Sequence, residues 1–124
     1  MTKYINYIGT PFKELDCYNL VKRIYKDIYN LDILETQTKA NDSVNINKEY
    51  KDEAMNWVKV EKPCKGCIVA IKFDPLLPKV VTHFGFAIDE FKMIHTTSKT
   101  DCVLENISKY SKLIDGYYLH KELI

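Results

Sequence analysis

Glycine is scarce in this sequence, with only four Gly among 124 residues, and they form no Gly-rich loop of the kind that binds phosphate. No charge is in excess either, because 18 Lys and Arg face 17 Asp and Glu and leave a formal net charge of +1. So small a net charge gives no broad field that would attract nucleic acid or anionic lipid. We therefore expect no nucleic-acid partner.

Long apolar runs are also missing. No stretch reaches the roughly 18 apolar residues of a transmembrane helix, and the N-terminal residues lack the basic start and apolar run of a secretory signal. We expect no signal peptide, no membrane insertion and a soluble protein made in the cytoplasm. Because thiols stay reduced there, the four Cys are not expected to form a disulfide framework.

Apolar residues, by contrast, make up 46% of the chain, and nine Tyr and five Phe add large side chains. This composition is far from that of disordered chains. A length of 124 residues suits one domain with one core, so we expect a single domain over residues 1–124.

The clearest predicted helix begins at Cys17. Its apolar residues recur with the i, i+3, i+4, i+7 spacing of one helix face, at Cys17, Leu20, Val21, Ile24, Tyr25, Ile28 and Tyr29. Asp16 directly precedes this series, where a short acidic side chain can accept from free backbone N–H groups, so it is the predicted N-cap. Cys17 then falls in the first turn, on the buried side.

The middle of the chain is polar and only weakly patterned. A second helical series is predicted at Tyr50, Ala54, Trp57 and Val58, and we interpret residues 32–60 as a variable insert. The second half is rich in β-branched and aromatic residues, separated by turn signals, which predicts antiparallel strands at residues 68–73, 80–88, 91–95, 102–105 and 114–119. A helical front half and a strand-rich back half predict an α+β domain.

Cys17 is a candidate nucleophile, because the first turn of a helix favours a thiolate through free N–H groups and the helix dipole. Such a nucleophile needs an imidazole to take its proton and a polar group to orient that ring. His83 and His95 fall in the two arms of a predicted hairpin. A loop of residues 88–90 would place His83 directly opposite His95, whereas a two-residue loop would place it opposite Thr96, on the other face.

Plainer interpretations stand beside this one. A Cys at the start of an amphipathic helix is commonly a small core residue, and His83 alone would also suit a hydrogen-bonded core histidine. His120 is expected to be solvated. Cys64 and Cys67 form a Cys-x-x-Cys that could start a zinc site or act as a redox pair, but a zinc site would need Cys102 and a His to complete it. We expect no metal.

Three segments resemble, in order, the NlpC-type papain-like cysteine peptidases. GTPFKELDCYNLV, at residues 9–21, is similar to the family's G-x-P-Y element followed by D-C-S-G-L-V, which carries the nucleophile. THFGFAI, at residues 82–88, is similar to the strand H-x-G-hydrophobic that carries the base, and MIHTT, at residues 93–97, to the strand whose His orients that base. Residues 103–118 resemble the strand, turn and closing strand that end these domains.

This resemblance implies a papain-like fold in which an N-terminal helix carrying the nucleophile packs on a C-terminal antiparallel sheet. It also implies a hydrolase that cleaves amide bonds in murein stem peptides, with Cys17 as nucleophile, His83 as base, His95 as orienting residue and no cofactor. Supporting or substrate-binding positions match Phe12, Asp16, Tyr18, Thr82 and Gly85.

Within the family, a bulky residue after the Cys, here Tyr18, resembles the short peptidases of phage tail operons. That resemblance implies phage tail proteins as partners and a place in the virion tail. Two departures oppose activity: Phe12 replaces a usual Tyr that supports the oxyanion site, and Asn19 replaces a usual Gly. Tyr4, Tyr7 or Tyr18 are candidates for the missing hydroxyl. The alternatives are therefore an inactive or assembly-activated tail or peptide-binding module, and a thiol acyltransferase on the same fold.

Overall fold

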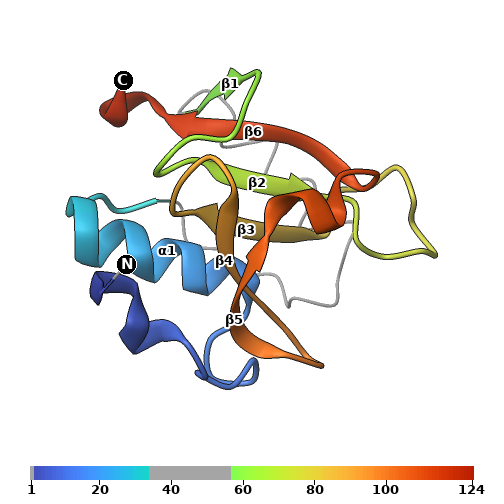
Figure 1. Ribbon diagram of the computed structural model, residues 1–124, viewed down its shortest axis with the longest axis horizontal. Helices are drawn as coiled ribbons and strands as arrows, with labels where there is room; N and C mark the ends of the chain where they lie inside the picture. Colours follow the sequence, from blue (N-terminus) through green and yellow to red (C-terminus); the bar gives the residue numbers. More distant parts are fainter. Residues whose placement is uncertain (1, 34–56) are drawn as a thin grey trace.

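Six antiparallel strands form one sheet in the computed structural model, which describes residues 2–33 and 57–124 (Figure 1). The strand order is β1-β6-β2-β3-β4-β5. The strands are β1 (Trp57–Val60), β2 (Ile68–Ile71), β3 (His83–Ala87), β4 (Lys92–Thr97), β5 (Asp101–Asn106) and β6 (Ile114–His120). Within the described residues there is one α-helix, α1 (Cys17–Tyr29), and the short 3-10 helices are η1 (Thr2–Tyr7), η3 (Ile107–Tyr110) and η4 (Lys121–Leu123). The predicted α+β class is confirmed.

Helix α1 begins at Cys17, as the apolar spacing predicts. Asp16 has extended backbone angles, and its carboxylate accepts from the Asn19 N–H at 3.1 Å, which confirms the predicted N-cap. The helix ends at Asn30, whose φ of 54° is left-handed and stops the helical hydrogen-bond series.

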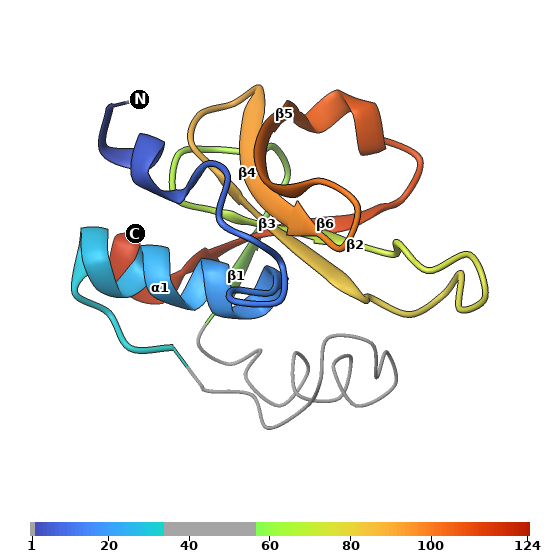
Figure 2. The ribbon, with the colours of Figure 1, turned by 90° about the horizontal axis from the view of Figure 1, so that it is seen from below.

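Helix α1 and the short helix η3 lie on opposite sides of the sheet (Figure 2), and buried apolar residues form two clusters. Phe84 and Phe86 of β3 belong to the cluster that packs on α1, where the fully buried Tyr25 ring lies 5.6 Å from Phe86. The opposite face carries Ala87 and Met93 and is covered by η3. Alternate residues of β3 therefore face different layers, and His83 shares the face of Ala87.

The predicted second helix is wrong at its C-terminal end. Trp57 and Val58 lie in β1, which pairs with β6. Tyr50 and Ala54, like most of the predicted insert, lie outside the described residues. The helical spacing of four residues was outweighed because the Trp-Val-Lys-Val segment pairs with β6 and packs the Trp57 ring 5.5 Å from Tyr25.

His120 is buried rather than solvated, with 7% of its surface exposed. It pairs with Trp57 across the sheet, and the two ring centroids are 4.9 Å apart. Its Nδ1 accepts from the Glu122 N–H at 3.2 Å. The expectation failed because strand β6 extends through His120, up to the first residue of η4.

The register of the β3–β4 hairpin also differs from both predicted alternatives. Ala87 pairs with Met93, and residues 88–91 connect the two strands. The Asp89 carboxylate closes this turn by accepting from the N–H groups of Phe91 and Lys92, both at 2.8 Å. His83 is therefore displaced by two positions from the predicted direct pairing with His95. A shift of two keeps both residues on one face, since side-chain direction repeats every second residue.

None of the helices in residues 2–33 and 57–124 is both long and apolar enough to cross a membrane.

Candidate active site

The Cys17 thiol lies near the start of β3, where that strand is not yet paired with β4. The two strands pair at Phe86–Ile94 and Ala87–Met93. Phe84 lies outside this pairing, and its backbone N–H faces the Cys17 sulfur. Because Phe84 directly follows His83, the start of α1 and the start of β3 bring the candidate nucleophile beside the backbone of the candidate base.

Burial dominates the chemistry of the Cys17 thiol. The side chain is 3% exposed, and the loss of water raises the pKa to about 12 although the N–H groups of Phe84, Tyr18 and Cys17 itself lower it. The nearby Asp16 carboxylate raises it further. The effect of the helix N-terminus expected from the sequence is therefore present but outweighed, and the resting thiol keeps its proton.

His83 and His95 are in direct contact. His83 Nε2 lies 2.8 Å from His95 Nδ1, and the residues are 4% and 0% exposed. Burial, and then the neighbouring His95, lower the pKa of His83 to about 3, while Glu105 opposes this shift. Burial also lowers the pKa of His95. Both imidazoles are therefore neutral near pH 7, joined by one hydrogen bond.

Beyond His95 the hydrogen-bond chain continues to Glu105 on β5. His95 Nε2 lies 2.6 Å from Glu105 Oε1, the Tyr110 hydroxyl donates to the same oxygen at 2.7 Å, and Lys109 contacts the other oxygen. Burial alone would raise the pKa of Glu105, but these three donors together lower it to about 2. Glu105 is therefore an anion that only accepts hydrogen bonds.

Glu105 was missed in the sequence. Its spacing from Val103 was the available signal. Val103 pairs with His95, and residues two apart on a strand share a face, so Glu105 lies on the face of His95. The length of the β4–β5 turn sets which residue pairs with His95, and the sequence alone does not determine that length.

Thr82 and Gly85 support the His83 surroundings. The Thr82 hydroxyl accepts from the N–H groups of Phe73 and Asp74, both at 3.1 Å, and so ties down the loop before β3. That loop places the Phe73 ring 5.0 Å from the imidazole of His83. Gly85 follows His83 by two residues on β3, and a Cβ built there would lie 2.6 Å from the Met93 sulfur and 3.5 Å from the His95 Cβ.

Phe12 and Tyr18 lie on either side of the helix start. The Phe12 N–H donates to Asp101 at 3.1 Å, which holds the segment before α1 against the start of β5. The half-buried Tyr18 ring meets Phe84 edge-on at 5.8 Å.

The other two tyrosines considered for the missing hydroxyl lie elsewhere. Tyr7 donates to Asp27 at 2.7 Å, near the far end of α1. The Tyr4 ring packs 5.8 Å from Phe86. Tyr18 is thus the tyrosine of the three that contacts a residue beside the thiol.

The remaining Cys residues do not converge. The Cys64 N–H donates to the Cys67 sulfur at 3.4 Å in the turn before β2, whereas Cys102 is buried in the cluster on the α1 side. In the part of the chain that the structure describes, no three His, Cys, Asp or Glu residues group to hold a metal ion.

No protein-family model matches the chain, and a search of curated proteins gives no match. A function must therefore be assigned from the chemistry of this site and from the resemblance in its sequence motifs.

Proposed function

We propose that this chain is a cysteine hydrolase of amide bonds in which Cys17 is the nucleophile, His83 the base and His95 the residue that orients the base. The observation that carries the proposal is the 2.8 Å contact between the two buried imidazoles. It lies at the start of β3, where the N–H of the next residue, Phe84, faces the Cys17 sulfur. A thiol, an imidazole and a second polar group are the parts of a nucleophilic triad. Here the two imidazoles are in contact, and the thiol lies beside the backbone of Phe84, the residue after His83.

The reaction follows from these parts. His83 takes the thiol proton, and the Cys17 sulfur attacks the carbonyl carbon of an amide to give a tetrahedral oxyanion, which the free N–H at the start of α1 helps to stabilise. The C–N bond breaks as His83 returns the proton to the leaving amine, leaving a thioester. Water then attacks the thioester with His83 as base, and the acid and free thiol are released.

The substrate class comes from the motifs rather than from the site geometry. The papain-like NlpC resemblance of the segments around Cys17, His83 and His95 points to murein stem peptides. The resemblance of Tyr18 and its neighbours to phage tail peptidases points to tail proteins as partners and to a place in the virion tail. The observed α+β architecture is compatible with both.

One observation favours a second candidate, a tail or peptide-binding module that is active only within an assembly. Cys17 and His83 are 3% and 4% exposed, and a site this closed does not admit a peptide without a rearrangement. With the pKa of the thiol about 12 and that of His83 about 3, the resting pair is also neutral. Binding to a partner could supply the opening that the isolated chain lacks.

Cleavage of purified murein separates the two candidates. We expect the wild-type chain to release stem-peptide fragments, detected by mass spectrometry, and Cys17→Ser to release none. Cys64→Ser is the matched control, since Cys64 lies in a half-buried turn before β2 and should leave cleavage unchanged. Cleavage that survives in Cys17→Ser would exclude this nucleophile. A folded wild-type chain that cleaves only when tail proteins are added would support the assembly-activated module.

A further inference from the structure

The hydrogen bonds beyond His95 have a fixed direction. Glu105 is an anion, so its contact of 2.6 Å with His95 Nε2 requires the proton to be on that nitrogen. His95 is neutral, so its Nδ1 then carries a lone pair. The 2.8 Å contact between His95 Nδ1 and His83 Nε2 in turn requires the proton to be on His83 Nε2. His83 is left with its lone pair on Nδ1.

We propose that Glu105 is a positioning residue that fixes the tautomers of both imidazoles and thereby keeps the Nδ1 of His83 free to accept a proton. The tautomer assignment stands on the hydrogen-bond geometry together with the anionic state of Glu105 and the neutral state of His95. Its consequence for catalysis rests on the proposed function, because a lone pair on His83 matters only if His83 takes the proton of Cys17.

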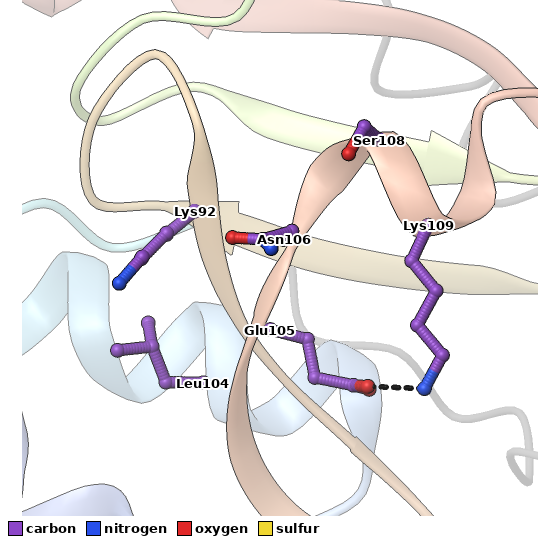
Figure 3. Close-up of a pocket in the computed structure, with 6 residues that line it drawn as sticks. All are labelled: Lys92, Leu104, Glu105, Asn106, Ser108 and Lys109. Carbon is purple, nitrogen blue, oxygen red and sulfur yellow. Dashed lines mark hydrogen bonds and ion pairs between the residues drawn. The ribbon is translucent and has the colours of Figure 1, made fainter.

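The surroundings of Glu105 suit this role. Its side chain is 18% exposed and lies in an open pocket of about 560 Å³ on β5 and η3, where Figure 3 shows its ion pair with Lys109. Tyr110 donates to the oxygen that also meets His95, and its ring lies 5.2 Å from the His95 ring. Three donors therefore converge on one carboxylate, and the tyrosine also holds the imidazole plane.

The substitution Glu105→Gln tests the donor-to-acceptor direction of these hydrogen bonds. An amide has one oxygen, and the cation of Lys109 draws it to the position that Oε2 holds in the wild type. The NH₂ group then takes the position of Oε1, where the Tyr110 hydroxyl can accept from it. The NH₂ group is then turned toward His95, where it can only donate, so the proton of His95 must move to Nδ1 and that of His83 must also move to Nδ1. The lone pair of the base would be lost.

Nitrogen NMR of the imidazoles in the ¹⁵N-labelled full chain measures these tautomers directly. In the wild type, between about pH 6 and about pH 8, we expect both His83 and His95 to be protonated at Nε2. A wild-type spectrum with either ring protonated at Nδ1 overturns the proposal, whether or not any variant folds.

The variants then test Glu105 as the cause. Glu105→Gln should move the proton to Nδ1 of both rings, while the charge-matched control Glu14→Gln, on the exposed side of the segment before α1, should leave both spectra as in the wild type. Unchanged tautomers in a folded Glu105→Gln chain overturn the proposal.

Murein cleavage distinguishes this inference from the proposed function. If the chain cleaves murein, Glu105→Gln should slow it by about 100-fold, the lower range for a lost general base. If the wild type shows the expected tautomers but never cleaves murein, the proposed function fails and the positioning role of Glu105 stands. If the wild type cleaves murein but either ring is protonated at Nδ1, the proposed function stands and the positioning role of Glu105 fails.

Discussion

At the scale of single residues, the candidate site contains a neutral thiol, Cys17, and a neutral imidazole, His83, and both are buried. The His83 imidazole lies between the Phe73 ring, 5.0 Å away, and His95, and the Cys17 sulfur meets backbone N–H groups rather than water. A low-polarity site of this kind disfavours every charged form. The thiolate and imidazolium that the proposed reaction needs are therefore expected to form only when a substrate or partner brings in polar groups.

Removing the Phe73 ring should raise the pKa of His83 toward its ordinary value of 6.5, because burial is the largest cause of its depression. The measurement is an NMR titration of the His83 imidazole in Phe73→Ala. Leu76→Ala is the matched control: Leu76 belongs to the same loop but is 86% exposed, so its loss should leave the titration unchanged. Equal titrations in both variants would show that the ring does not shield His83.

The same depression makes stability depend on pH. Unfolded His83 binds a proton below 6.5, whereas the folded residue binds one only near 3, so its contribution is complete above 6.5 and is lost as the pH falls from 6.5 toward 3. We expect the urea midpoint of the wild type to fall between about pH 7 and about pH 4, and to fall less in His83→Gln. The exposed substitution Lys99→Asn should keep the wild-type dependence. An equal fall in His83→Gln would contradict the assignment.

At the scale of elements, the β3–β4 hairpin decides whether the imidazoles meet. Both predicted turns were too short, because the Asp89 carboxylate closes a longer turn through the N–H groups of Phe91 and Lys92. This chemistry is local but is hard to recognise in a sequence, since an Asp suits many turns. Of the two predicted turns, the three-residue turn nevertheless gave the shared face of His83 and His95, because a shift by two residues preserves it.

Gly85 in that hairpin is expected to tolerate no side chain. The Cβ of an alanine would lie 2.6 Å from the sulfur of Met93, which is fully buried and cannot swing into solvent. Gly85→Ala should therefore lower the free energy of unfolding by about 1–3 kcal/mol, measured by urea denaturation. In the Met93→Val background, which shortens the opposing side chain, the same change should cost less. Purely additive costs would show that the contact with Met93 is not the reason.

At the scale of the whole molecule, α1 and the sheet bring together residues far apart in the chain. The periodicity around Cys17 was strong enough to predict α1, its N-cap and its buried face, and β-branched runs predicted five of the six strands. β1 was missed because its four residues carry too little pattern, and its pairing with β6 is a long-range event. The contact of Glu105 with His95 depends on how β5 pairs with β4, and the burial of His83 depends on where the loop with Phe73 lies. No local sequence pattern predicts either of these long-range contacts.

The most direct test of the central claim uses a stem-peptide analogue that carries a thiol-reactive ketone, with mass spectrometry to identify the labelled Cys. Such a reagent needs an oriented nucleophile and base rather than a merely accessible thiol. We expect Cys17 to be labelled faster than the more exposed Cys64, and its rate to drop by about 100-fold in His83→Gln while that of Cys64 stays the same. Labelling of Cys17 that is no faster than that of Cys64, or that is unaffected by His83→Gln, would contradict a working Cys17–His83 pair.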